Sequence, residues 1–178
     1  SINSTEGTLY FEGSSLSNDG TSRSVSIFQN GSNFIKFQYS SSSNRVDFVA
    51  FSAGAVSCNI TKVITNTTEN AKFGLKWKLN DFALWINGLE VGTDTSGNTP
   101  IGMDKISFTN EGGSSGNFFG KTKALAVWKT ALSDQELADL TYPTPTFPTF
   151  TLDFNTIAEQ FTFARGSEAT YVDAQGLI

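Results

Sequence analysis

The sequence predicts an all-β protein, an antiparallel β-sandwich with one short helix near its C-terminal end and an extended tail. Apolar residues occupy every second position over most of the chain, which is the pattern of strands with one buried face. Loops rich in Ser, Asn and Gly separate these runs. About ten short runs at regular spacing are typical of a sandwich or barrel.

The segment KFGLKWKL shows the strand pattern most clearly. Alternation places four apolar side chains on one face, those of Phe73, Leu75, Trp77 and Leu79. The lysines at 76 and 78 fall on the other face, so we expect one buried and one solvent-exposed side of this strand. Asn80-Asp81 is expected to form the tight turn that follows.

Two Asn-Gly pairs indicate hairpins. Asn87-Gly88 separates Phe82–Ile86 from Leu89–Val91, and both residues tolerate the positive φ angles of a type I′ turn. Asn30-Gly31 is the second signal. The other expected strands are TLYFE, SVSIF, NFIKFQY, RVDFVAF, AVSCNI, DKISF and NFFGKTKALAVW.

The helix is predicted in LSDQELADL. Ser133 stands at the N-cap position with Glu136 three residues later, which is the spacing of a capping box. Leu132 and Leu137 are placed to form the flanking apolar contact.

The chain after the helix is predicted to leave the sandwich, which we assign to residues 1–142. Residues 143–149 are rich in Pro and Thr and are expected to form an extended linker. Residues 150–178 are too few for a core of their own, and we expect an extended tail or the start of a following module. Four phenylalanines there are candidates for an assembly contact: Phe150, Phe154, Phe161 and Phe163.

The amino-acid composition excludes several classes of function. Lys and Arg are scattered in a chain of formal charge −5, so nucleic acid is not an expected partner. No apolar run reaches the roughly 20 residues that span a bilayer, so membrane insertion is not expected. There is no His and one Cys, which excludes His-based triads, Cys/His zinc clusters and internal disulfides. Cys58 is expected to be a small buried hydrophobe.

Longer motifs carry a family resemblance. FALWINGLEV, followed by the late strand and helix KALAVWKTALSDQELADL, resembles the laminin-G-like and concanavalin A-like jelly-roll domains over about residues 1 to 142. INSTEGTLYFE, LKWKLNDFALWINGLEVGTDTSG and FTFARGSEATYVDAQGLI are similar to modules of bacteriophage structural and tail-associated proteins.

The resemblance implies a non-catalytic structural module of a phage appendage: a tail, a fibre or a head decoration. Such a protein is assembled in the host cytoplasm and exposed on the virion. Its partners would be other virion proteins or copies of itself, and host cell-surface polysaccharide. The alternative is a dedicated carbohydrate-binding or receptor-binding lectin domain, and a third reading is a glycan-degrading enzyme.

The enzyme reading lacks a carboxylate pair. Glycosidases of this fold carry closely spaced carboxylates on one strand, and hydrolysis needs two carboxyl groups flanking the scissile bond. No such run is present. Glu6 and Glu12 are expected far apart on a strand edge, and the other acids in turns or at the helix start. We therefore predict no catalytic residues.

Three residues are candidates for ligand binding. Trp85 shares a face with Ala83, opposite Leu84 and Ile86, and so points away from the core. There its indole would form a stacking platform for a sugar, or a neighbouring loop or the C-terminal tail would cover it. Asn110 and Asn117 lie in a rim loop and are the other candidates.

No cofactor is predicted, and calcium is the one ion considered. Calcium binds carboxylate and amide oxygens in loops, which makes Asp19, Asp94 and Glu111 candidates. The spacing of a calcium-binding loop is absent, and Asp and Asn are also ordinary turn residues. We favour the turn interpretation.

Overall fold

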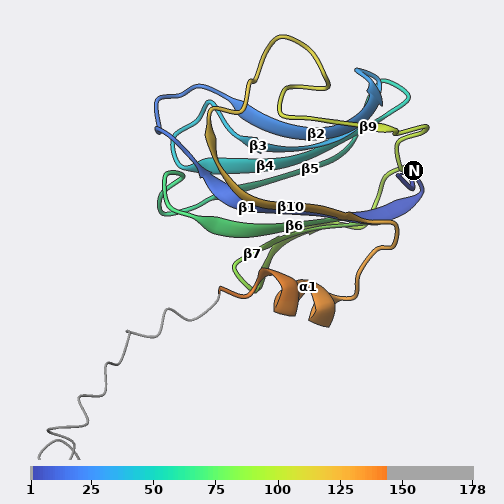
Figure 1. Cartoon of the computed structure of the whole chain (residues 1–178). Coiled ribbons are helices and arrows are strands. Elements are labelled where there is room, and N and C mark those ends of the chain that lie inside the picture. Colours follow the sequence, from blue (N-terminus) through green and yellow to red (C-terminus); the bar gives the residue numbers. More distant parts are fainter. Residues whose placement is uncertain (1, 144–178) are drawn as a thin grey trace, which may run out of the picture. The chain divides into compact units, whose positions relative to one another are not determined.

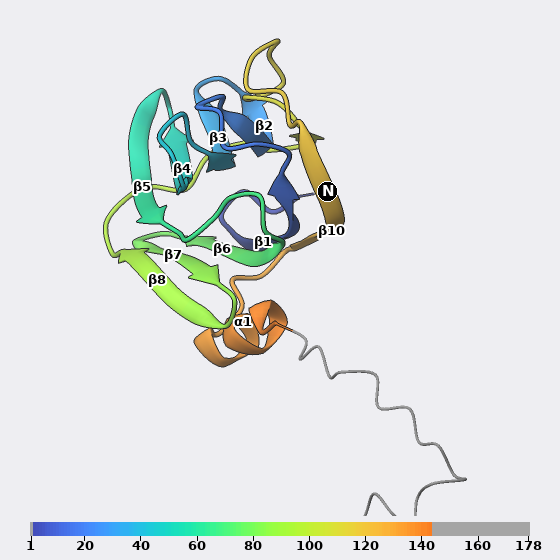
Figure 2. The ribbon, with the colours of Figure 1, turned by 90° about the vertical axis from the view of Figure 1, so that its left-hand side faces the viewer.

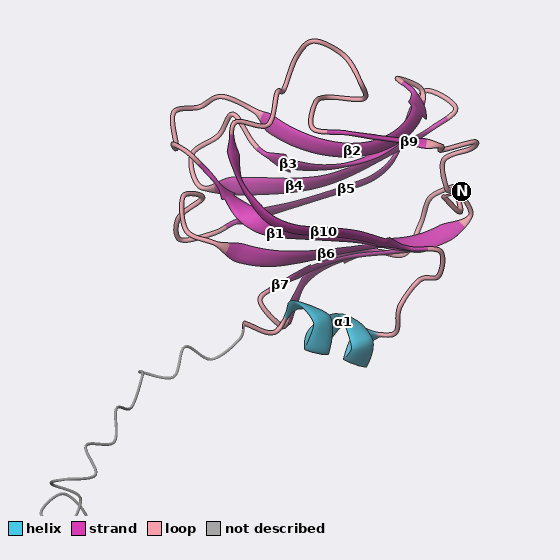
Figure 3. Cartoon of the chain, in the orientation of Figure 1, coloured by secondary structure: helices cyan, strands magenta, loops and turns pink. Residues whose placement is uncertain are grey.

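A computed structural model of the protein describes residues 2–143. Within this range, two five-stranded antiparallel sheets pack face to face and one helix lies against the outer side of one of them (Figures 1 and 3). The predicted all-β antiparallel sandwich is therefore confirmed. Among these residues no helix is long and apolar enough to cross a membrane.

The two sheets are named A and B. Sheet A contains, in spatial order, β10 (Gly120–Trp128), β1 (Glu6–Ser15), β6 (Ala71–Lys78), β7 (Asp81–Ile86) and β8 (Leu89–Asp94). Sheet B contains β5 (Ala55–Val63), β4 (Arg45–Ser52), β3 (Asn33–Tyr39), β2 (Arg23–Asn30) and β9 (Lys105–Ser107). The helix α1 spans Asp134–Thr141.

The core lies between the sheets and is built on phenylalanine rings. Phe37 of β3 touches both Phe11 of β1 and Phe73 of β6, with ring centroids 5.1 and 4.5 Å apart. Trp77 is fully buried, as its alternation with two lysines predicted. Cys58 is 1% exposed, which confirms its assignment as a buried hydrophobe. Burial raises the pKa of its thiol to about 12.

The turns follow the predictions with one correction. Asn87 and Gly88 have φ angles of 50° and 83°, which confirms a type I′ hairpin between β7 and β8. The turn predicted at Asn80-Asp81 begins one residue earlier, because Asp81 already pairs with Lys78 in the sheet. Leu79 therefore lies in the turn and is 58% exposed, so its predicted place on the core face is wrong.

The helix begins as predicted. The Glu136 N–H donates to Ser133 Oγ at 3.4 Å, and the Ser133 N–H donates to Glu136 Oε2 at 2.8 Å. Leu137 is completely buried against Trp85 and Ala83 of β7. A glycine at position 74 leaves room for this contact, since a Cβ there would lie 3.1 Å from Leu137 Cδ2.

Because α1 covers part of the outer face of sheet A, that face is only partly exposed to solvent. Lys76, predicted on the solvent-exposed face, is only 9% exposed. Its Nζ lies 2.9 Å from Asp81 Oδ1 and 3.3 Å from Asp134 Oδ1, in the first turn of α1. The helix thus supplies one of the charges that make burial of this lysine tolerable.

Replacement of Leu137 by Ala should destabilise the sandwich. The lost contact with Trp85 leaves a cavity, for which we expect a loss of about 2–5 kcal/mol in unfolding free energy, measured by chemical denaturation. Gln135→Ala, on the exposed side of α1, is the control and should change the value by less than about 0.5 kcal/mol. Equal effects of the two changes would contradict the role given to α1.

Candidate ligand-binding groove

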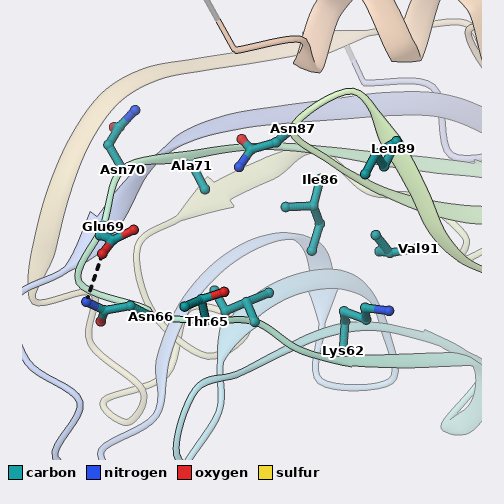
Figure 4. Close-up of a pocket in the computed structure, with 11 residues that line it drawn as sticks. Lys62, Thr65, Asn66, Glu69, Asn70, Ala71, Ile86, Asn87, Leu89 and Val91 are labelled. Atoms are coloured by element: carbon teal, nitrogen blue, oxygen red, sulfur yellow. Dashed lines mark hydrogen bonds between the residues drawn. The ribbon is translucent and has the colours of Figure 1, made fainter.

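A groove lies along the open side of the sandwich, between the edge strands β5 and β8. Figure 2 shows these two strands one above the other on the same side. Towards one end Ile60 closes on Gly92, where a Cβ would lie 2.5 Å from Ile60 Cγ2. Around Lys62 and Leu89 a cavity of about 290 Å³ remains (Figure 4). This volume is just below the roughly 300–1,000 Å³ typical of small-molecule sites.

The lining of the groove combines apolar and polar side chains. The apolar members are Ile64, Ala71, Ile86, Leu89 and Val91. The polar members are Lys62, Thr65, Asn66, Glu69, Asn70 and Asn87. In Figure 4 the β7–β8 hairpin and Ala71 of β6 supply the apolar residues of the upper wall, and β5 with the chain after it supplies the lower wall. Lys62 and Glu69 stand towards opposite ends.

Hydrogen bonds fix the polar rim in place. Asn87 Oδ1 accepts from the Lys72 N–H at 2.9 Å, and the Asn87 N–H donates to Lys72 O at 3.0 Å. Asn66 Nδ2 donates to Glu69 Oε1 at 3.4 Å, and Asn66 Oδ1 accepts from the Thr68 N–H at 3.0 Å. The side-chain oxygens of Asn87 and Asn66 are thus tied to the backbone, which lowers the entropic cost of using these two amides in binding.

Beside the rim lies a buried carboxylate that the sequence did not reveal. Glu12 is 6% exposed, and its Oε1 accepts from Asn70 Nδ2 at 3.0 Å and lies 2.8 Å from Lys123 Nζ. Tyr10 OH donates to Glu12 Oε2 at 3.0 Å. Burial opposes ionisation of Glu12, but the bonds from Lys123, Asn70 and Tyr10 outweigh it and lower the pKa.

The expected position of Glu12 on a strand edge is wrong. β1 is an inner strand, because β10 pairs with its free side. This pairing joins segments more than a hundred residues apart and has no local signal. The one hint is a charged residue within the otherwise uncharged run GTLYFEG.

Trp85 is placed by the structure under α1. Its side chain points to the outer face of sheet A, as predicted, but is 7% exposed and packs on Leu137. Of the two interpretations of Trp85, the covered side chain is confirmed and the exposed stacking platform is wrong. Among the described residues the covering segment is the helix α1 rather than a loop, and the tail lies outside these residues.

The predicted Asn ligands lie elsewhere, in the loop between β9 and β10. Asn110 Oδ1 accepts a hydrogen bond from Lys36 Nζ, and Asn117 is exposed. Neither residue lines the groove. Asn110 meets Lys36 on the outer face of sheet B, whereas Trp85 lies under α1 on the outer face of sheet A. The structure therefore does not bring the three candidates into one site.

Each of the calcium candidates already has a hydrogen-bond or ion-pair partner within the protein. Asp19 Oδ2 lies 2.9 Å from Arg23 Nη2, whose hydrogen bond lowers the pKa of that carboxyl. Asp94 Oδ1 accepts from the Ser96 N–H at 3.0 Å. Glu111 Oε1 lies 3.0 Å from Lys36 Nζ. Across residues 2–143 there is no group of three or more Cys, Asp or Glu side chains that could hold a metal ion.

The groove has one carboxylate, that of Glu69, among its described lining residues. Glycoside hydrolysis by the usual route requires two. The phenylalanines proposed for an assembly contact, together with residues 144–149 of the expected linker, lie outside the described residues.

No protein-family model matches the sequence, and no curated protein does either. Solved structures do share the fold. The leech intramolecular trans-sialidase, complexed with 2,7-anhydro-Neu5Ac, has a TM-score of 0.65 at 18% identity, over 80% of this chain and 24% of that one. The CBM40 of the Ruminococcus gnavus IT-sialidase, bound to α2,3-sialyllactose, has a TM-score of 0.64 at 17% identity, over 78% and 84%.

Domains LG4-5 of the mouse laminin α1 chain give a TM-score of 0.53 at 9% identity, over 75% of this chain and 38% of that one. The fold is therefore a sandwich of the concanavalin A-like and laminin-G-like type. This chain spans most of the R. gnavus module, but about a quarter of the leech enzyme.

Glu12 should make the unfolding free energy of the domain depend on pH. Its depressed pKa means that it stabilises the fold above the ordinary value of 4.5, and that this contribution is lost as pH falls through the folded-state pKa. Glu12→Gln should therefore cost about 1–3 kcal/mol in unfolding free energy at neutral pH, and less in acid. Denaturant titrations across pH measure the difference, with the more exposed Glu6→Gln as control. A difference that stays constant down to acid pH would refute the assignment.

Proposed function

We propose that this domain is a non-catalytic glycan-binding module and that the groove between β5 and β8 is its binding site. The observation that carries the proposal is the lining itself. Ile86, Leu89 and Val91 offer an apolar wall to the C–H face of a sugar ring, while amides and Lys62 at the rim suit its hydroxyl groups.

The neighbours of known structure support this choice of ligand class. The R. gnavus CBM40 binds α2,3-sialyllactose and matches this chain over most of both lengths. A shared fold does not carry a site with it, so the groove of this chain has to be tested through its own residues. The single carboxylate of the lining favours binding over hydrolysis.

The charges of the rim bear on the kind of glycan. Lys62 is the one cation among the described lining residues, and it stands apart from Glu69. An acidic sugar would place its carboxylate at the Lys62 end, away from Glu69. A neutral glycan would be held by the apolar wall and the amides.

The biological setting we propose is a phage appendage on the virion, outside the host cell. Its partners there are other virion proteins or copies of this chain, and host surface polysaccharide is what the groove contacts. This setting rests on the sequence resemblance alone.

A glycan array with the full chain of residues 1–178 tests the function. The wild type should bind a defined subset of glycans, and chelation of calcium should leave binding unchanged. Leu89→Asp should weaken binding at least tenfold, or about 1.4 kcal/mol, because it puts a charge on the apolar wall. Val63→Asp is the matched control, since Leu89 and Val63 are both 69% exposed on edge strands but Val63 lies outside the groove.

Lys62→Ala separates the classes of glycan. It should weaken binding of acidic glycans and leave neutral ones unaffected. Absence of wild-type binding to every glycan would contradict the proposed function. Equal losses in Leu89→Asp and Val63→Asp would keep the function but remove the groove as its site.

A further inference from the structure

A second cluster of reactive side chains lies on the other sheet, where the β9–β10 loop folds against β2. Lys36, in the middle of β3, points to the outer face of sheet B with its side chain only 11% exposed. Its Nζ donates to Asn110 Oδ1 and lies 3.0 Å from Glu111 Oε1. An amine, a carboxamide and a carboxylate thus meet at one point.

The loop is fastened to the sheet on both sides of this cluster. Ser26 Oγ donates to Thr109 O at 2.8 Å, and the Ser24 N–H donates to Gly116 O at 2.9 Å. Within the loop, the Asn110 N–H donates to Ser115 O at 2.9 Å. These bonds hold Asn110 against Lys36 instead of leaving the contact to two flexible side chains.

The backbone at Glu111 is unusual. Its φ angle is +48°, which a residue with a long side chain rarely adopts, and Gly112 follows with +75°. A Cβ at Gly112 would lie 2.3 Å from Phe28 Cζ, so the tight turn needs glycine there. The turn directs the carboxylate of Glu111 back onto Lys36. Strained backbone of this kind is held only where the surrounding structure demands it, and it concentrates at functional sites.

We propose that Lys36 and Asn110 form an intramolecular isopeptide bond, with Glu111 as its acid–base catalyst. Glu111 first takes a proton from the Lys36 ammonium. The freed amine attacks Asn110 Cγ, a new C–N bond forms between them, and the original Cγ–N bond of the carboxamide breaks. Protons from the attacking amine pass by way of Glu111 to the leaving group, which departs as ammonium. The products are one amide and one ammonium ion, and Glu111 is regenerated.

The surroundings favour this transfer. Phe34, 4% exposed, places its ring centroid 5.4 Å from Lys36 Nζ, and Val49 is the cross-strand neighbour of Lys36 on β4. These two apolar residues limit the water that would compete with the amine for Asn110, while on the β2 side the cross-strand neighbour Ser26 is occupied by its bond to Thr109 O. Glu111, with its side chain 15% exposed, is the carboxylate in contact with Nζ.

The mass of the intact protein tests the proposal directly. Wild-type residues 1–178 should weigh less than their sequence mass by one molecule of ammonia, and digestion should yield a branched peptide joining Lys36 to Asn110. Asn110→Asp should lose water instead, and so reach the same final mass as the cross-linked wild type. Lys36→Arg and Glu111→Gln should keep the full mass of their own sequences. Lys105→Arg, a change at a nearby exposed lysine, should lose ammonia as the wild type does.

One other reaction releases ammonia, the cyclisation of Asn before Gly, for which Asn30 and Asn87 qualify. That loss would persist in Lys36→Arg, whereas loss through the isopeptide bond would not. A wild-type protein of full sequence mass overturns the proposal, as does a loss that Lys36→Arg retains. If Lys36→Arg does not fold, the branched peptide of the wild type decides by its presence or absence.

Discussion

The pairing of the first strand with the last is the constraint on which the rest of this structure depends. It makes β1 an inner strand and lets β10 extend sheet A. The ladder shifts register between Glu12 and Gly13, so Lys123 is the extra residue of a bulge, and its ammonium meets the Glu12 carboxylate. β1 also fixes the path of the chain from β10 to α1. Thr8 Oγ1 on β1 donates to Thr130 O and accepts from the Leu132 N–H. The placement of the helix over Trp85 therefore follows from a contact made at β1.

Local signals predicted what depends on local geometry. Asn87-Gly88 and the Ser133 capping box lie where expected, because each is decided within a few residues. The burial of Lys76 was missed, since it is enforced by α1, which lies far along the chain. Trp85 shows both cases. Alternation gave the direction of its side chain, but could not tell which segment would cover it.

The groove could not be predicted from any one motif for the same reason. Its walls come from the β7–β8 hairpin and from the chain around the end of β5, which meet only because these strands are the edges of opposite sheets on one side of the sandwich. Asn87 was identified as a turn residue, and its second role at the rim depends on β6, through its bonds to Lys72. Polar loops were a poor guide, because Asp19 and Asp94 bond to residues close in the sequence and Glu111 bonds to Lys36 of β3.

The outer faces of sheets A and B are both covered at Trp85 and at Lys36. The exposed apolar surface considered for binding therefore lies at the edge between β5 and β8. On sheet A, α1 buries Trp85; on sheet B, the loop from Thr109 to Gly116 lies over Lys36. A sandwich whose faces are covered in this way can still offer apolar surface where two edge strands part. Leu89 remains 69% exposed there although Ile86, three residues away across the hairpin turn, is 8% exposed. An exposed leucine next to buried core, framed by fixed amides, is a surface on which a ligand with one apolar face gains burial without displacing any part of the fold.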